Sequence, residues 1–101
     1  MNIEIKEENG GVRAVMEGRL DTAAAAETAP QFGQLCEKAD REITLDFARL
    51  DYISSSGLRL LIGLRKASAA KGGKVIIEKI NDSIRNVFTM TGFYSLFEIK
   101  D

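Results

Sequence analysis

The order of two apolar patterns along the chain is the feature that most constrains the fold. Apolar side chains that recur at every second position predict strands, and those that recur every three or four positions predict helices. Alternation or a short apolar run predicts strands at residues 3–6, 12–21, 42–47, 75–77 and 96–99. Helical spacing fills the gaps that follow the second, third and fourth strands, which gives the order β-β-α-β-α-β-α-β.

The connections between the strands predict how the strands pair. Strands separated by helices pair in parallel through right-handed crossovers, whereas the first two strands are joined only by the turn Glu8-Asn9-Gly10-Gly11. We therefore predict an α/β fold with an open mixed β-sheet, mostly parallel after an N-terminal hairpin and packed with helices. The length of 101 residues fits a single domain over residues 1–101.

The first helix has two possible starts. Asp21 and Thr22 are good N-caps ahead of an alanine-rich stretch, but Pro30 inside a helix removes a hydrogen bond and clashes with the preceding turn. Either the helix is kinked at Pro30, or its main body begins near Thr28 with the proline in its first turn. We favour the later start. The side chains expected on the buried face of this helix are Phe32, Leu35 and Cys36.

The middle of the chain is predicted to form a strand, a loop and a long helix. We interpret Ala48-Arg49-Leu50-Asp51 as a short loop that leads from the third strand to Tyr52 and Ile53. A helix then runs from about Ser56 to Ala70 and ends at Gly72-Gly73.

The charge balance limits the partners of the chain. Lys and Arg number 14 against 15 Asp and Glu, so the net charge is -1 and gives no overall attraction to nucleic acid or to an anionic membrane. No apolar run approaches the roughly 18 residues that a membrane-spanning helix needs, and the N-terminal residues do not resemble a signal peptide. The single cysteine suits a reducing compartment. We expect a cytoplasmic protein with no direct nucleic-acid contact and no membrane insertion.

The absence of histidine lowers the expectation of catalysis. Most general bases and many metal sites near neutral pH depend on imidazole, and the chain has none. It also shows no metal-ligand spacing and no phosphate-cradling loop. We expect a protein that is not an enzyme and that has no cofactor.

The segment Asp51-Tyr52-Ile53-Ser54-Ser55-Ser56-Gly57-Leu58-Arg59 places three hydroxyls between a strand end and a helix N-terminus. Backbone N–H groups are unpaired there and the helix dipole is positive, so an attached phosphate meets oriented donors. A serine in this position is a chemically sensible phosphorylation site. Serines before a helix also serve only as caps and turn formers, but three in a row are more than one cap needs.

This segment and two others resemble the STAS domain of bacterial anti-sigma factor antagonists. Gly18-Arg19-Leu20-Asp21 resembles the family's G-x-L-D after the second strand. Leu45-Asp46-Phe47 through Tyr52-Ile53-Ser54-Ser55-Ser56-Gly57-Leu58 resembles its apolar strand followed by D-S-[ST]-G-L. Phe88-Thr89-Met90-Thr91-Gly92-Phe93 resembles its closing F-x-x-[ST]-G-[LF]. The three motifs stand in the family's order and spacing, and the resemblance covers nearly the whole chain.

The resemblance implies a function in partner switching. The family's phosphorylated serine directly follows the motif aspartate, and that place falls on Ser55, while the aspartate place itself is held by Ser54. The unmodified domain would bind an anti-sigma factor that is itself a serine kinase. The kinase would phosphorylate Ser55 and so end the complex, and a serine phosphatase would reset it. Asp21 matches the family aspartate near the phosphosite, which contacts the partner or orients the hydroxyl.

The second helix is predicted to form part of the docking surface. Gly63 lies between Arg59 and Lys66 on the side away from the core, where it permits close approach while the cations bind acidic groups. The plainer interpretation is that Gly63 fits local packing and that the cations are solvated. An exposed mid-helix glycine costs roughly 1 kcal/mol, which favours docking. The other residues of the predicted contact region are Asp21, Ser54, Ser56 and Gly57.

An alternative function is a constitutive STAS adaptor that is not phosphorylated, such as a subunit of a transporter or of a sensory complex. Ser54 in the place of the family aspartate favours this alternative. Whether Ser54 or Ser56 substitutes for Ser55 as the modified residue is left open by the sequence.

Overall fold

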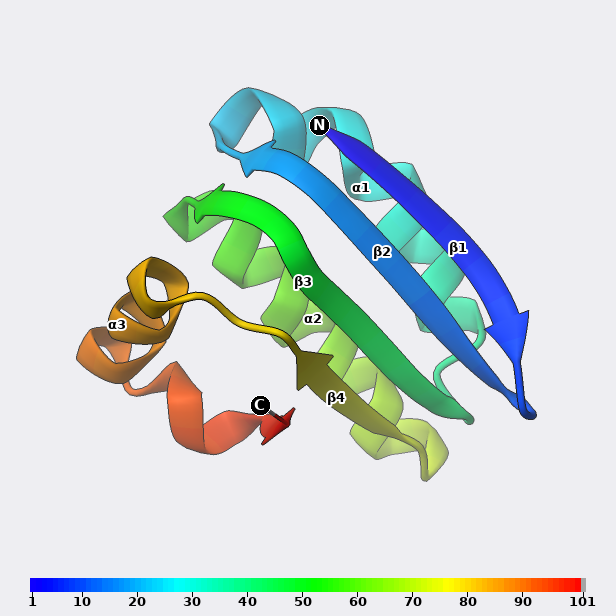
Figure 1. The fold of residues 1–101 in the computed structure, drawn as a ribbon. Helices are drawn as coiled ribbons and strands as arrows, with labels where there is room; N and C mark the ends of the chain where they lie inside the picture. Colours follow the sequence, from blue (N-terminus) through cyan, green and yellow to red (C-terminus); the bar gives the residue numbers. More distant parts are fainter. Residues whose placement is uncertain (101) are drawn as a thin grey trace.

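The computed structural model describes residues 1–100, which form a mixed β-sheet with helices packed against one of its faces (Figure 1). The strands are ordered β1-β2-β3-β4-β5 across the sheet, with β1 antiparallel to β2 and the remaining neighbours parallel. This arrangement confirms the predicted fold class and element order. The elements are β1 (Asn2–Glu8), β2 (Gly11–Leu20), α1 (Thr22–Glu37), β3 (Glu42–Ile53), α2 (Ser55–Lys71), β4 (Lys74–Glu78), α3 (Asp82–Thr91), the 3-10 helix η1 (Phe93–Leu96) and β5 (Glu98–Lys100).

The hairpin between β1 and β2 follows from its turn residues. Asn9 and Gly10 have φ angles of 52° and 78°, and Glu8 pairs with Gly11 on either side of them. A two-residue turn with positive φ at both positions matches the twist of paired strands, and asparagine followed by glycine adopts it most readily.

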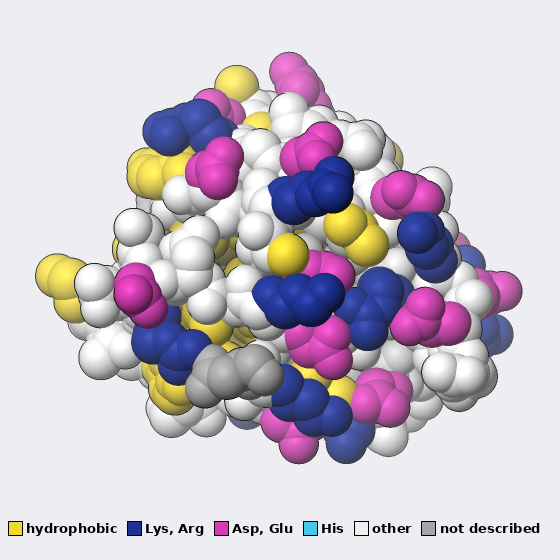
Figure 2. Space-filling model, viewed as in Figure 1, with side chains coloured by type: hydrophobic (Ala, Val, Ile, Leu, Met, Phe, Trp, Pro, Cys, Tyr) yellow, Lys and Arg dark blue, Asp and Glu magenta, His cyan; other side chains and the backbone are white. Residues whose placement is uncertain are grey.

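The core lies between the sheet and the α1–α2 layer. In Figure 1, α1 and α2 lie side by side behind the strands, and α3 lies beyond the end of β4. The buried side chains alternate along β2, as the sequence predicted, while the opposite face of the sheet carries intermingled basic and acidic side chains (Figure 2). The largest fully buried side chains are Phe47, Phe88, Met16, Leu20, Leu35, Ile43, Leu45, Leu50, Leu61, Leu64, Ile76 and Ile77.

The predicted late start of α1 is wrong. The helix begins at Thr22, with Asp21 as its N-cap, and Pro30 lies inside it. Pro30 is exposed, whereas Ala24, Ala25 and other side chains along the helix are buried against the core. Burial of the whole apolar face together with a well-formed cap outweighs the cost of one internal proline, about 3 kcal/mol.

The predicted loop at residues 48–51 is also wrong, because β3 is continuous from Glu42 to Ile53. The register with β2 shifts twice, between Val15 and Glu17 and between Gly18 and Arg19. Each shift is a β-bulge that inserts an extra residue into β3 and breaks the simple alternation of apolar side chains. The broken alternation is what resembled a loop in the sequence.

Two smaller predictions need adjustment. Cys36 is half-buried at the edge of the core, where burial raises the pKa of its thiol and nearby Lys71 opposes that change. The last strand begins at Glu98, and Leu96 belongs to η1.

Candidate functional site: the junction of β3 and α2

Helices α1, α2 and α3 all begin at one edge of the sheet. The carboxyl ends of the parallel strands β2, β3 and β4 meet at this edge, and the helix that follows each strand starts there. The side chains of Asp21, Ser54 and Asn81 cap the three helices. The Asn81 Nδ2 also donates to the Leu50 carbonyl of β3 at 2.8 Å, which ties the start of α3 to the middle strand.

Ser54 anchors the start of α2 to the end of β2 by hydrogen bonds. Its Oγ accepts a hydrogen bond from the Gly57 backbone N–H at 3.1 Å, and its own N–H donates to the Leu20 carbonyl at 2.8 Å. The residue is buried, so its hydroxyl acts as an internal cap. Serine and aspartate are about equally good N-caps, which explains why this position accepts serine in place of the family aspartate without loss of the helix start.

Ser55 is the first residue of α2, one position earlier than the predicted helix start. Its side chain is exposed, and that of Ser56 is half-buried. Of the three hydroxyls, the structure therefore directs that of Ser55 most openly to solvent. This placement leaves Ser55 accessible from solvent, next to the backbone donors of the first helical turn.

Gly57 is buried and has a packing role. A Cβ atom at this position would lie 2.7 Å from the Cγ of Leu20 and 3.0 Å from the Cγ1 of Ile53. Glycine therefore allows the first turn of α2 to lie directly on the ends of β2 and β3. The sequence predicted Gly57 as part of the contact region, but the structure places it below the surface. There it sets the position of the exposed residues of α2.

The outward face of α2 brings together Arg59, Gly63 and Lys66, all of which are exposed. A Cβ atom at Gly63 would meet no atom within 4 Å, so local packing does not require a glycine there. The simple packing explanation for Gly63 is therefore not supported by its surroundings. Ser55 lies on the same face, since it precedes Arg59 by four residues.

Asp21 lies at the same edge but is engaged in a cap. Its Oδ1 accepts from the Ala24 N–H at 2.8 Å, and the side chain is half-buried at the start of α1. The pairing of Leu20 with Ile53 places the Asp21 cap beside the Ser54 cap.

One feature of this edge was not predicted from the sequence. The Arg19 guanidinium stacks over the Tyr52 ring, with its central carbon 4.4 Å from the ring centroid. Arg19 and Tyr52 are register partners on β2 and β3, and both are exposed. Only the strand register brings Arg19 and Tyr52 together, and that register depends on the two bulges of β3.

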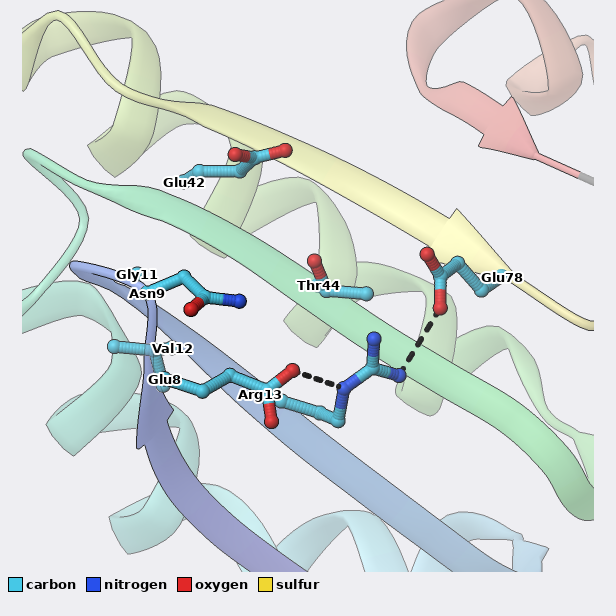
Figure 3. Close-up of a pocket in the computed structure, with 8 residues that line it drawn as sticks. All are labelled: Glu8, Asn9, Gly11, Val12, Arg13, Glu42, Thr44 and Glu78. Carbon is cyan, nitrogen blue, oxygen red and sulfur yellow. Dashed lines mark hydrogen bonds and ion pairs between the residues drawn. The ribbon is translucent and has the colours of Figure 1, made fainter.

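The hollow at the opposite end of the sheet has a different character (Figure 3). It measures about 190 Å³ and is crossed by the Arg13 guanidinium, which lies 2.9 Å from Glu8, 3.0 Å from Glu78 and 3.3 Å from Asp46. Hydrogen bonds to Glu8 and then to Glu78 raise the pKa of Arg13 above its usual value. Through these ion pairs, Arg13 of β2 links side chains of β1, β3 and β4 and joins the four strands on this face of the sheet.

Residues 1–100 contain neither a metal-binding cluster of side chains nor a membrane-spanning helix. The side chains of His, Cys, Asp and Glu there form no group of three or more that could hold a metal ion. None of the helices described for this part of the chain is long and apolar enough to cross a membrane.

The fold and the junction together define a small α/β domain organised around an exposed serine at a strand–helix boundary. The chain belongs to the STAS domain family, whose model matches residues 2–101. It is 29% identical to BtrV of Bordetella bronchiseptica over 100% of this chain and 87% of that relative. It is 28% identical to the anti-sigma F factor antagonist of Paenibacillus polymyxa over 100% of this chain and 89% of that relative.

A solved structure shares the fold at lower identity. The Bacillus cell fate determinant SpoIIAA in its phosphorylated form superposes with a TM-score of 0.74 and 20% identity, covering 99% of this chain and 92% of that chain.

Proposed function

We propose that this chain is an anti-sigma factor antagonist that works by partner switching. In its unmodified form it binds an anti-sigma factor that is also a serine kinase, and phosphorylation of Ser55 ends that complex. A serine phosphatase then returns the chain to its binding form. The family relationship, the relatives named as antagonists and the fold shared with a protein that exists in a phosphorylated form all support this proposal.

The observation that carries the proposal is the position of Ser55. It is exposed at the first residue of α2, between a buried cap at Ser54 and a buried packing residue at Gly57. The backbone of the junction is thus held rigidly while one hydroxyl projects from it. Phosphoryl transfer from ATP to the Ser55 Oγ, with release of ADP and the hydroxyl proton, requires such a presented hydroxyl.

The phosphate has opposite effects inside the domain and at the interface. Inside the domain, the first turn of α2 stabilises negative charge. At a protein interface, an added charge of about -1.5 to -2 must be desolvated and repels acidic groups of the partner. An affinity loss of about 2.8 kcal/mol lowers binding a hundredfold, so the switch needs no change of fold.

The exposed residues of the junction form the contact surface in this proposal. Ser55, Arg59, Gly63 and Lys66 contact the partner along the outward face of α2, with Ser56 at its margin. Ser54 and Gly57 hold the backbone beneath this surface. The cap at Asp21 forms its border at the start of α1.

Kinase labelling tests the site. Incubation with the cognate anti-sigma kinase and ATP is expected to label the parent chain and to leave Ser55→Ala unlabelled, as measured by intact-mass spectrometry. Ser83→Ala is the matched control, because Ser83 is an exposed serine in the first turn of α3 at the same edge of the sheet. Labelling of Ser55→Ala at the parent level would overturn the assignment.

A constitutive adaptor is the alternative, and the serine at position 54 is the observation that favours it. An adaptor binds its partner whether or not position 55 carries negative charge. Purification of the chain with a partner that is not a kinase, with an affinity unchanged by Ser55→Glu, would establish the adaptor and exclude the switch.

A further inference from the structure

The exposed face of α2 places Ser55 in line with two cations. Ser55, Arg59, Gly63 and Lys66 follow one another at spacings of four, four and three residues, which keeps them on one side of a helix. All four are exposed. The hydroxyl proposed for phosphorylation therefore lies one helical turn before Arg59.

The charge of α2 is entirely basic. Residues 55–71 contain Arg59, Arg65, Lys66 and Lys71 and no acidic side chain. Two of these cations are already engaged, since Arg65 Nε donates to the Leu96 carbonyl at 2.6 Å and Lys71 Nζ donates to the Cys36 carbonyl at 2.8 Å.

Arg59 and Lys66 differ from those two. Neither side chain makes a hydrogen bond or an ion pair with another side chain or with the backbone of residues 1–100. They are the cations that the outward face of α2 offers to an approaching group. A partner that is complementary to this face carries acidic groups.

A phosphate on Ser55 would have Arg59 as its natural partner. Side chains four residues apart on a helix are neighbours, and an anion placed before a cation is the favourable order. The guanidinium also matches the phosphate oxygens with two parallel hydrogen bonds. Lys66 lies eleven residues from Ser55, or about 16 Å along the helix axis, and is out of reach.

We propose that Arg59 changes its ionic partner when Ser55 is phosphorylated. In the unmodified domain, Arg59 binds an acidic group of the partner protein. After phosphorylation, its guanidinium pairs with the phosphate within α2, so the docking face gains an anion and loses a cation in one event. The contact with the partner rests on the proposed function, whereas the pairing of Arg59 with the phosphate is a property of the chain alone.

The pairing is tested on chains in which phosphoserine is built into position 55 during synthesis, so that no kinase is needed. The pH midpoint of the second phosphate ionisation is followed by ³¹P NMR in the parent, in Arg59→Gln and in the matched control Lys66→Gln. A neighbouring cation favours the dianion and lowers the pKa of the phosphate. We expect Arg59→Gln to raise the midpoint by a few tenths of a pH unit, with Lys66→Gln equal to the parent. The acidic side chains Asp21, Asp51 and Asp82 near this edge are the same in all three chains and cancel in the comparison.

An unchanged midpoint in Arg59→Gln would overturn the pairing, as would an equal rise in Lys66→Gln. Both results are independent of whether a kinase modifies Ser55, so they are distinct from failure of the proposed function.

A binding cycle with the anti-sigma kinase tests the other half of the proposal. Arg59→Gln is expected to weaken binding of the unmodified chain. It should cause no further weakening in the phosphorylated chain, because the Arg59 guanidinium there already pairs with the phosphate and no longer binds the partner protein. Equal weakening of the two forms, or no weakening of the unmodified form, would contradict the double role of Arg59.

Discussion

Helices α1 and α2 lie side by side on the same face of the sheet and begin at the same edge, yet their starts are built differently. In α1 the cap Asp21 binds the N–H of Ala24, and in α2 the cap Ser54 binds the N–H of Gly57. A Cβ is accommodated at the capped position of α1 but would collide with Leu20 at the corresponding position of α2.

The exposed faces of the two helices differ even more. The only ionic side chains of α1 are the glutamates Glu27 and Glu37, whereas α2 carries basic side chains alone. Both helices have N-caps and buried apolar faces. These shared features stabilise the helices but do not distinguish a binding surface. What distinguishes α2 is an exposed serine in its first turn that is followed by exposed cations, since α1 also carries an exposed glycine at Gly33.

Negative charge at the first residue of each helix gives the largest expected contrast. Ser55→Glu and Thr22→Glu both place a carboxylate at an exposed helix start, where the fold tolerates it. We expect Ser55→Glu to lower affinity for the anti-sigma kinase by about a hundredfold, or about 2.8 kcal/mol, and Thr22→Glu to leave it unchanged. Isothermal titration calorimetry measures both. A similar loss in the two variants would remove the distinction between the helices.

The next contrast concerns stability, at the residues whose N–H groups bind the N-cap side chains, Ala24 in α1 and Gly57 in α2. Gly57→Ala introduces a Cβ against Leu20 and Ile53 and is expected to lower the free energy of unfolding by about 1–3 kcal/mol. Ala24→Gly, the reverse change in α1, is expected to cost only about 0.5–1 kcal/mol. Urea unfolding followed by circular dichroism measures both. If Gly57→Ala were as stable as the parent, the proposed close packing of α2 on the strand ends would be wrong.

The two caps are expected to be alike in energy. Ser54→Ala and Asp21→Ala each remove the acceptor of a capping hydrogen bond and should lower the free energy of unfolding by about 1 kcal/mol. Ser54→Asp keeps an acceptor and restores the family aspartate, so its stability should match the parent within a few tenths of a kcal/mol. If Ser54→Asp lowered the free energy of unfolding as much as Ser54→Ala, the capping role would not explain why serine occupies position 54.

The smallest effects concern two exposed glycines. Gly63 in α2 and Gly33 in α1 both have open space where a Cβ would stand. Alanine at either position should therefore raise the free energy of unfolding by about 0.5–1 kcal/mol. Only Gly63→Ala should also weaken binding of the anti-sigma kinase. Unchanged binding by a stabilised Gly63→Ala would mean that the partner does not approach the backbone there.

The parts of the molecule that the sequence predicted depend on local patterns. The hairpin follows from Asn9-Gly10, the buried alternation of β2 from residues 12–16, and the junction at Ser55 from a strand end followed by a helix. Each of these signals lies within a few neighbouring residues. Local patterns were therefore enough to predict the element order and the strand–helix junction, whereas the choice of Ser55 as the candidate site rested on the resemblance to the STAS family.

The features that escaped prediction depend on contacts between distant segments. The early start of α1 requires burial of its alanines against the core, which outweighs Pro30. The continuity of β3, and with it the stack of Arg19 on Tyr52, depends on bulges that exist only when β2 and β3 pair. The packing role of Gly57 depends likewise on Leu20, a residue of another strand.

The most direct test of the central claim is the dissociation constant of the anti-sigma kinase for the unmodified chain and for a chain with phosphoserine built in at position 55. A chain with phosphoserine at Ser83, in the first turn of α3, serves as the control for added charge at the same edge. We expect binding about a hundredfold weaker with phosphoserine at position 55 and nearly parental binding with phosphoserine at position 83. Equal affinity of the unmodified chain and the chain phosphorylated at Ser55 would contradict a phosphorylation switch at Ser55.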